Sequence, residues 1–185
     1  MFYTERELKK IGFKAIGDNV LISDKASIYG AENIEIGSNV RIDDFVILSA
    51  GDGGIKLGSY IHIACFAQLI GHASITLDDF AQVSGKCSIY SSSDDFSGTY
   101  LVGPTIPMEF LNVKHLSVHL KSHTLLGCNT VIMPGVTIGE NTCTGAMSLV
   151  LKDLKPNSVY VGAPAKLIAD RFQLNRAAKE WTLNR

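Results

Sequence analysis

The sequence has little charge imbalance, few cysteines and prolines, and no long hydrophobic run. Its 185 residues include 17 Lys and Arg against 18 Asp and Glu, which gives a formal net charge of -1. This balance gives no reason to expect a nucleic acid or a membrane surface as a partner. No apolar run approaches the roughly 20 residues needed to span a bilayer. The first seven residues lack the charged-then-apolar layout of a signal peptide, so we expect a cytoplasmic protein.

The motifs of zinc, redox and covalent-nucleophile enzymes are also missing. None of the four cysteines forms a C-x-x-C pair, so we expect neither a metal cofactor nor a redox motif. There is no G-x-S-x-G and no other Ser/His/Asp signature, so no protein nucleophile is predicted. Small-hydrophobe packing is the simplest role for Cys65, Cys87, Cys128 and Cys143.

What the sequence does contain is a period of six. Between Leu120 and Leu151, every sixth residue falls on one phase, and all but one of these residues are aliphatic: Leu120, Leu126, Ile132, Ile138, Thr144 and Val150. A small or β-branched residue stands two places before the later members: Thr124, Thr130, Val136, Thr142 and Ser148. Strand side chains alternate faces, so both members of each pair face one interior. Amphipathic helices need apolar spacing near 3.6, so this period favours short strands.

Three such six-residue units make a triangular coil, and stacked coils form an all-β parallel β-helix of hexapeptide repeats. The phase runs earlier in the chain too, with two-residue steps near Ile36, Leu57 and Leu77. We read each step as an extra residue pair at a corner.

We expect one domain over residues 1–185, in five segments. Thr4, Glu5 and Glu7 predict a short capped helix in a lead-in that closes the solenoid end. Serines, glycines and prolines interrupt the repeat and predict a long ejected loop. Apolar spacing near the end predicts a C-terminal helix. The segments are an N-terminal cap at 1–15, coils at 16–90 and 117–162, the loop at 91–116, and the helix at 163–185.

Two segments, VIMPGVTIGENTCTGAMSLVLKDL (131–154) and SVYVGAPAKLI (158–168), resemble the hexapeptide-repeat acyltransferases. This family contains galactoside and maltose O-acetyltransferases and sugar-nucleotide N-acyltransferases. The resemblance implies a left-handed β-helix, acetyl-CoA as co-substrate, and a homotrimer with acyl-CoA in the grooves between subunits. It also implies that the long loop wraps a neighbouring subunit. A groove between two rigid walls suits a long linear ligand.

The sequence of the long loop indicates which subgroup of this family the chain resembles. Galactoside and maltose enzymes have a histidine at its head, whereas this chain reads SSSDDFSG, with Asp94 near that place. The sequence is similar to a subgroup with DDFSG-type loops that acylates dTDP-4-amino-4,6-dideoxyglucose. That similarity implies an amino sugar nucleotide as acceptor and a role in surface polysaccharide (lipopolysaccharide) biosynthesis. O-acetylation of a sugar hydroxyl is the alternative, followed by a zinc hydratase like the γ-carbonic anhydrases and by an inactive scaffold.

Direct acyl transfer needs a base for the acceptor and a donor for the oxyanion. Asp94 and Asp95 have three open interpretations: base, sugar ligand, or turn residue. Histidine titrates near neutrality, and His123 is the favoured catalytic histidine. His62 and His72 are candidates for substrate binding. The predicted catalytic pair is therefore His123 and Asp94, with Asp95 on the substrate.

The family resemblance also implies where acyl-CoA binds. Small residues in the last coils let the pantetheine arm lie along the backbone, and the matching positions are Gly127, Gly145 and Ala146. Lysines near the end of the chain would contact the nucleotide phosphates, as suits compact point charges. The matching lysines are Lys152 and Lys166.

Overall fold

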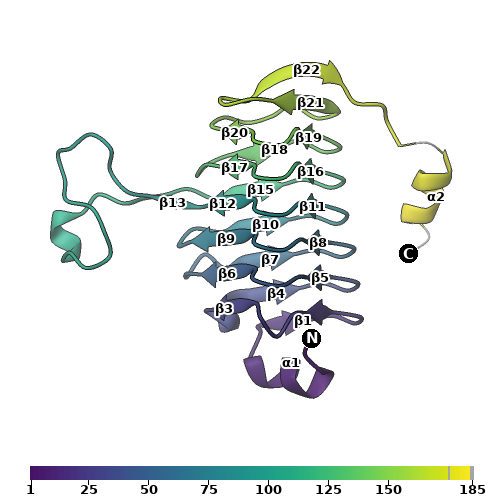
Figure 1. Cartoon of the computed structure of the whole chain (residues 1–185), viewed down its shortest axis with the longest axis horizontal. Helices are drawn as coiled ribbons and strands as arrows, with labels where there is room; N and C mark the ends of the chain where they lie inside the picture. The colour runs from purple at the N-terminus through teal and green to yellow at the C-terminus, as the bar shows by residue number, and fades with distance from the viewer. Residues whose placement is uncertain (175, 184–185) are drawn as a thin grey trace.

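The computed structural model describes the backbone of residues 1–174 and 176–183, which winds into a left-handed parallel β-helix of about seven turns (Figure 1). Each full turn adds one short strand to each of three parallel sheets. The first sheet contains β1 (Ala15–Ile16), β4 (Ile34–Ile36), β7 (Ile55–Leu57), β10 (Ile75–Leu77), β15 (Val118–Leu120) and β18 (Thr137–Ile138). The all-β, left-handed parallel β-helix predicted from the sequence is confirmed.

The other two walls of the prism continue the same pattern. The second sheet contains β2 (Leu21–Ile22), β5 (Arg41–Ile42), β8 (His62–Ile63), β11 (Gln82–Val83), β16 (Leu125–Leu126), β19 (Cys143–Thr144), β21 (Ser158–Val161) and β22 (Lys166–Asp170). The third contains β3 (Ser27–Tyr29), β6 (Ile47–Ala50), β9 (Gln68–Gly71), β12 (Ser88–Tyr90), β17 (Val131–Ile132) and β20 (Leu149–Val150). We call the junctions between the first and second, second and third, and third and first sheets the first, second and third corners.

The six-residue period fills the interior of the prism. The phase residues Leu120, Leu126 and Ile138 are fully buried, and most of their counterparts in the earlier turns are buried too, although Ile16 and Ile28 in the first turn are only partly buried. The small residues two places earlier are buried with them. Three of the four hydroxyls among them are hydrogen-bonded inside the wall, whereas Thr124 Oγ1 has no partner among the described residues. Thr130 Oγ1 lies 3.0 Å from Thr144 Oγ1, and Ser148 Oγ donates to the Gly145 carbonyl. Burial of the aliphatic side chains provides the main driving force for this fold.

The first corner places one residue per turn in the left-handed backbone region, with φ from 51° to 64°. Asparagine is favoured there because its short side chain tolerates positive φ. Four of the seven corner residues are asparagines, and the middle three are aromatic: Asn19, Asn39, Tyr60, Phe80, His123, Asn141 and Asn157. The rings stack on one another from turn to turn, with Tyr60 and Phe80 centroids 4.9 Å apart.

The third corner collects the extra residues of the chain. Ile36 pairs with Leu57 and Leu57 with Leu77, so these turns are 21 and 20 residues long, whereas Leu120 and Ile138 are 18 apart. The predicted two-residue steps are therefore corner insertions, one of which forms the 3-10 helix η1 (Ala31–Asn33).

The largest insertion is the long loop, which leaves this corner after β12 and stands away from the prism, as predicted (Figure 1). An antiparallel pair, β13 (Ser92–Ser93) and β14 (Lys114–His115), forms its base, and η2 (Met108–Phe110) lies near its tip.

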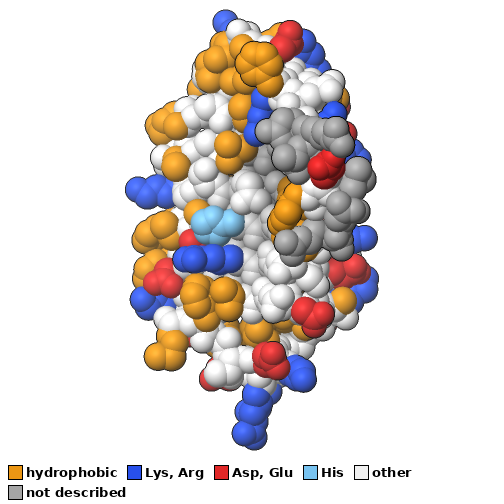
Figure 2. Space-filling model, turned by 90° about the vertical axis from the view of Figure 1, so that its right-hand side faces the viewer, with side chains coloured by type: hydrophobic (Ala, Val, Ile, Leu, Met, Phe, Trp, Pro, Cys, Tyr) orange, Lys and Arg blue, Asp and Glu red, His pale blue; other side chains and the backbone are white. Residues whose placement is uncertain are grey.

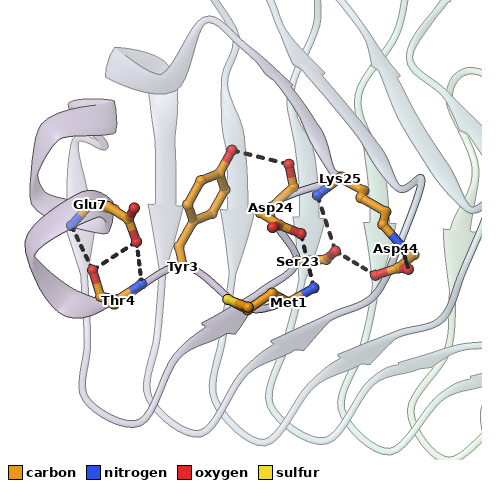
Figure 3. Close-up of polar contacts among 8 residues, drawn as sticks. All are labelled: Met1, Tyr3, Thr4, Glu7, Ser23, Asp24, Lys25 and Asp44. Carbon is orange, nitrogen blue, oxygen red and sulfur yellow. Dashed lines mark hydrogen bonds and ion pairs between the residues drawn. The ribbon is translucent and has the colours of Figure 1, made fainter.

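The N-terminal lead-in closes the lower end through α1 (Glu5–Ile11). Thr4 and Glu7 form a complete capping box, and Gly12 ends the helix with φ 85°. Figure 3 shows how the residues before the helix attach to the first turn: the Met1 amino group lies 3.0 Å from Asp24, and the Tyr3 hydroxyl donates to the Asp24 carbonyl.

The C-terminal prediction was wrong in extent. A helix was expected over 163–185, but β22 (Lys166–Asp170) pairs antiparallel with β21, and only α2 (Arg176–Leu183) is helical. The last turn of a β-helix presents an unpaired strand edge, and a returning strand satisfies its backbone groups. This long-range need outweighed the local apolar spacing. Positions 175 and 184–185 lie outside the described residues. Of the helices described, none is both long and apolar enough to cross a lipid bilayer.

Candidate active site

The head of the long loop is held at the third corner by two consecutive serines. Ser91 is buried, and its hydroxyl donates to the Ala73 carbonyl over 2.6 Å. Ser92 Oγ accepts the His72 backbone N–H over 2.8 Å and lies 2.8 Å from His115 Nδ1. The loop therefore leaves the prism from a defined point, two residues before Asp94.

The two loop carboxylates have different surroundings. Asp94 is exposed, and its carboxylate has no hydrogen-bond or ion-pair partner in the described part of the chain. Asp95 Oδ2 accepts hydrogen bonds from the Ser97 hydroxyl and the Ser97 N–H at 2.6 and 3.1 Å. The Ser97 hydroxyl is the main cause that lowers the pKa of Asp95. Asp95 thus organises a turn as an ionised carboxylate, and Asp94 is the one available to a ligand.

His123 lies on a different corner from the loop. It occupies the left-handed position of the first corner, and its ring stacks on Phe80. Burial against its neighbours is the largest cause that lowers its pKa, which favours the neutral imidazole. The Arg171 guanidinium donates to its carbonyl oxygen over 3.0 Å. Within one chain, the predicted pair His123 and Asp94 is therefore split between two corners.

Three further histidines each lie beside an aspartate. His62 Nε2 is 2.7 Å from Asp43, which also binds Arg41; burial would raise the pKa of Asp43, but these two hydrogen bonds lower it. His119 Nε2 is 2.8 Å from Asp78 on the first sheet. At the third corner, His72 Nε2 is 3.5 Å from Asp52.

The candidate substrate ligands are also dispersed. His62 lies on the second sheet and His72 at the third corner, next to the loop base. Within residues 1–174 and 176–183, no group of three or more His, Cys, Asp or Glu could hold a metal ion.

The small residues predicted for acyl-CoA do come together. Gly127, Gly145 and Ala146 stack at the second corner of successive turns. A Cβ on Gly127 would lie 2.6 Å from the Ala146 nitrogen, and one on Gly145 would lie 2.6 Å from a Val161 methyl. Glycine is thus required at these two positions for the walls to approach, and neither glycine projects a side chain there.

The two candidate lysines lie near the upper end of the prism. Lys152 is exposed at the third corner and lines a cavity of about 360 Å³ with Tyr160 and Pro164. Lys166 is exposed at the start of β22 rather than on a helix. A second cavity of about 400 Å³ is lined by His123 at the first corner and by Gln173, Leu174 and Lys179 near the end of the chain. Neither Lys152 nor Lys166 has an ion-pair partner in the part of the chain that the structure describes, so each is available to an anionic group.

Exposed apolar side chains mark the outer surface. Figure 2 shows the side that lies on the right in Figure 1, where hydrophobic groups stand between charged residues of both signs. Large apolar side chains are exposed on the second sheet, at the second corner and along the loop: Leu21, Phe45, Phe66, Leu125, Met147, Phe96, Met108 and Phe110. The Phe45 and Phe66 rings stack with centroids 5.0 Å apart.

Comparison with known proteins agrees with this architecture. Residues 117–152 match the family model "Bacterial transferase hexapeptide (six repeats)". An Escherichia coli protein named dTDP-4-amino-4,6-dideoxy-D-glucose acyltransferase is 45% identical over 170 residues, 92% of this chain and 88% of its own length. A putative lipopolysaccharide biosynthesis O-acetyl transferase, WbbJ, from E. coli K12 is 27% identical over 86% of this chain and 79% of its own length.

Solved structures of AntD, an N-acyltransferase from Bacillus cereus, are close in shape. The S84C variant in complex with dTDP-4-amino-4,6-dideoxyglucose and coenzyme A has a TM-score of 0.94 and 46% identity, and covers 99% of this chain and 97% of AntD. AntD with dTDP and 3-hydroxybutyryl-CoA has a TM-score of 0.91 and 47% identity, and covers 99% of this chain and 95% of AntD. The chain belongs to the hexapeptide-repeat acyltransferase family. It is an acyltransferase that uses an acyl-CoA as co-substrate.

The AntD structures include variants at an aspartate 94 and a serine 84. This chain has Asp94 and Ser84 at the same numbers, and Ser84 was not singled out from the sequence. It follows β11 at the start of the second corner, where it is half-buried and donates its N–H to the Leu126 carbonyl. In this chain, a serine at a corner is typical of a turn.

Proposed function

We propose that this enzyme transfers the acetyl group of acetyl-CoA to the amino group of a dTDP-linked 4-amino-4,6-dideoxy sugar. The observation that carries this proposal is the 45% identity, over 92% of the chain, to an enzyme named for that acceptor. The AntD complex with the same sugar nucleotide and coenzyme A supports it at a TM-score of 0.94. The product would feed surface polysaccharide, such as lipopolysaccharide, biosynthesis.

The reaction is a direct transfer. The neutral amine attacks the thioester carbonyl, the C–S bond breaks, and coenzyme A leaves as its thiolate. The amine proton passes to a carboxylate or to the leaving thiolate. Asp94 is the proposed proton acceptor or amine ligand, because its carboxylate is exposed on the loop and has no competing partner among the described residues. Positioning both substrates supplies much of the rate enhancement.

The proposed assembly is a homotrimer. The loop stands away from its own prism (Figure 1). It has large exposed apolar side chains, among them Phe96 and Met108. Exposed apolar side chains of this kind mark a surface that packs against another protein. The exposed, stacked rings of Phe45 and Phe66 on a neighbouring copy are the proposed contact surface. Such a trimer would place the Asp94 of one subunit against a wall of the next.

Several finer assignments belong to the same proposal. Gly127, Gly145 and Ala146 line the path of the pantetheine arm, and Lys152 and Lys166 meet the phosphates of coenzyme A. His123 is the proposed second catalytic group, while His62, His72 and Asp95 contact or shape the sugar site. Residues 1–185 act as one domain. A cytoplasmic location is supported by four free cysteines, since thiols persist in reducing compartments.

A free-thiol release assay tests the acceptor. Purified enzyme is given acetyl-CoA and a panel of dTDP-sugars that carry either an amine or a hydroxyl at C4. We expect thiol release with the 4-amino sugar and background with its hydroxyl counterpart. The WbbJ-like alternative, O-acetylation, predicts the reverse pattern. Release with hydroxyl acceptors alone would overturn the proposal.

Binding of the donor is tested separately. A ligand that binds only the folded state stabilises it by about 2.7 kcal/mol at one hundred times its Kd. Acetyl-CoA should therefore raise the melting temperature in a concentration-dependent way. An unchanged melting temperature at millimolar acetyl-CoA would favour an inactive scaffold.

A further inference from the structure

The exposed Asp94 needs an anchor that its own side chain does not provide. The carboxylate has no partner in the described part of the chain, and the only hydrogen bond recorded for Asp94 is from Ser93 Oγ to its carbonyl. Its position is therefore set by the backbone that leads to it. Two residues of extended chain span at most about 7 Å, so whatever fixes Ser92 also fixes where Asp94 emerges.

Ser92 is fixed by two hydrogen bonds from opposite sides. Its Oγ accepts the backbone N–H of His72 over 2.8 Å. The oxygen then has one hydrogen of its own to donate, and His115 Nδ1 lies 2.8 Å away. A neutral His115 with its proton on Nε2 accepts that hydrogen, so the hydroxyl bridges the prism corner and the returning strand.

The bridge crosses the base of the loop. Ser92 and His115 are opposite each other in the antiparallel pair of β13 and β14, so their bond ties the outgoing strand to the incoming one. The Leu116 N–H donates to the Ser91 carbonyl beside it. The His72 and His115 rings lie 4.9 Å apart, and Asp52 is 3.5 Å from His72 Nε2. The remaining charged neighbour on β14 is Lys114.

We propose that Ser92 and His115 are positioning residues of the transfer reaction, whose hydrogen bond fixes the direction in which Asp94 leaves the prism. This inference rests on the proposed function, in which Asp94 meets the acceptor amine. Neither residue touches the reacting atoms. Loss of the bond leaves the β-helix intact and lets the loop exit vary. Misplacement of a catalytic group by about 1 Å costs on the order of 100-fold in rate.

The test compares removal of the bond with its replacement. His115→Ala and Ser92→Ala each remove the bridge, and we expect kcat to fall by about 10-fold or more. His115→Asn places an amide oxygen where Nδ1 was, so it can accept the same hydrogen and should restore kcat to within about threefold of wild type. The double variant should lose no more than either single variant, as for two residues that act through one bond.

Controls separate positioning from folding. Lys114→Ala changes the neighbouring residue of β14 and should leave kcat, both KM values and the melting temperature unchanged. In His115→Ala the melting temperature and the KM for acetyl-CoA should also stay at wild-type values. An unchanged kcat in His115→Ala, or a His115→Asn variant no better than His115→Ala, would overturn the inference.

A measurement without substrate keeps this outcome distinct from failure of the proposed function. Hydrogen–deuterium exchange over residues 93–113 should be faster in His115→Ala and return to the wild-type rate in His115→Asn. Equal exchange in all three proteins would refute the bridge even if the enzyme acts on another acceptor. Wild-type protein that releases no thiol, with exchange as expected, would count against the acceptor and leave the anchoring role supported.

Discussion

The imidazole ring of His123 lies flat on the phenyl ring of Phe80, with centroids 4.8 Å apart and an angle of 8° between the planes. His123 also stands one turn before Asn141 in the ladder of first-corner residues, and Asn141 Oδ1 is buried without a hydrogen-bond partner among the described residues. Elsewhere in the ladder, an asparagine donates upward to the next: Asn19 Nδ2 to Asn39 Oδ1, and Asn141 Nδ2 to Asn157 Oδ1. His123 therefore interrupts a repeating hydrogen bond in favour of an aromatic stack.

The stability of the fold should fall in mild acid because of His123. Burial lowers the pKa of His123 in the folded chain below the ordinary value of 6.5, so the unfolded chain binds more protons in the interval below that value. The contribution of His123 to the free energy of unfolding is therefore fully present above pH 6.5 and is lost as the pH falls toward the pKa of the folded state. We expect the melting temperature of the wild type to decrease over this interval.

The matched variant is His123→Asn, which keeps a residue that tolerates positive φ and offers an amide donor to Asn141. Its melting temperature should depend less on pH between 7.5 and 5.5. A variant with the same acid sensitivity as wild type would assign that sensitivity to other groups.

The turnover of a His123 variant tests the prediction that this residue is catalytic. His123→Ala should lower kcat more than it changes the affinity for acetyl-CoA, if the neutral ring accepts a proton in the transition state. The assay is thiol release at saturating donor and acceptor. Wild-type turnover in the variant would remove His123 from the mechanism and leave it as a corner residue.

The variant Asp94→Asn tests whether Asp94 acts as the general base or only binds the acceptor sugar. Loss of a general base typically costs about 100-fold or more in kcat. Loss of a sugar contact alone would raise the acceptor KM and spare kcat. We expect a fall in kcat, and Glu109→Gln on the same loop serves as the control because it removes a carboxylate from η2. Normal values of both constants would make Asp94 a turn residue.

Gly127→Ala should destabilise the upper turns. The added Cβ would lie 2.6 Å from the Ala146 nitrogen, a backbone atom that cannot swing aside. Overpacking of this kind costs about 1–3 kcal/mol. Gly85→Ala is the matched control, because its nearest atom, the Cys65 carbonyl oxygen, is 3.2 Å away. Urea unfolding measures both, and an equal midpoint for the two variants would contradict the close approach.

Cys87 should be inert while the protein is folded. Burial raises the pKa of its thiol to about 11, and the sulfur donates to the Gly127 carbonyl. Only the thiolate reacts with alkylating or disulfide reagents. At pH 8, labelling followed by peptide mass spectrometry should therefore find Cys65 and Cys128, which are exposed, and find Cys87 only after unfolding. Early modification of Cys87 would show that the wall opens locally.

The sequence predicted the parts of the fold that repeat. Ile132 and Ile138 could be predicted to face the interior because strand side chains alternate between two faces and the period is fixed. Each position of the repeat therefore has the same surroundings in every turn. The loop was found by its break in that period. The segment around Leu167 and Ile168 was mistaken for helix, since its place in β22 depends on an open edge that only the assembled prism presents.

The candidate site could be predicted from the sequence less well than the fold. Gly127 and Ala146 were chosen as small residues, and the structure brings them into contact. His123 and Asp94 were chosen as titratable residues near the loop, yet they occupy different corners of one chain. The bond from Ser92 to His115 could not be foreseen, because its partners are 23 positions apart in the sequence.

By itself the sequence determined the interior of this protein: a six-residue period leaves a β-helix as the way to bury every phase residue at once. Only the tertiary structure decided which polar side chains meet. Those contacts join residues from different turns and from the two ends of a loop, and their distances depend on how the corners stack rather than on spacing along the chain.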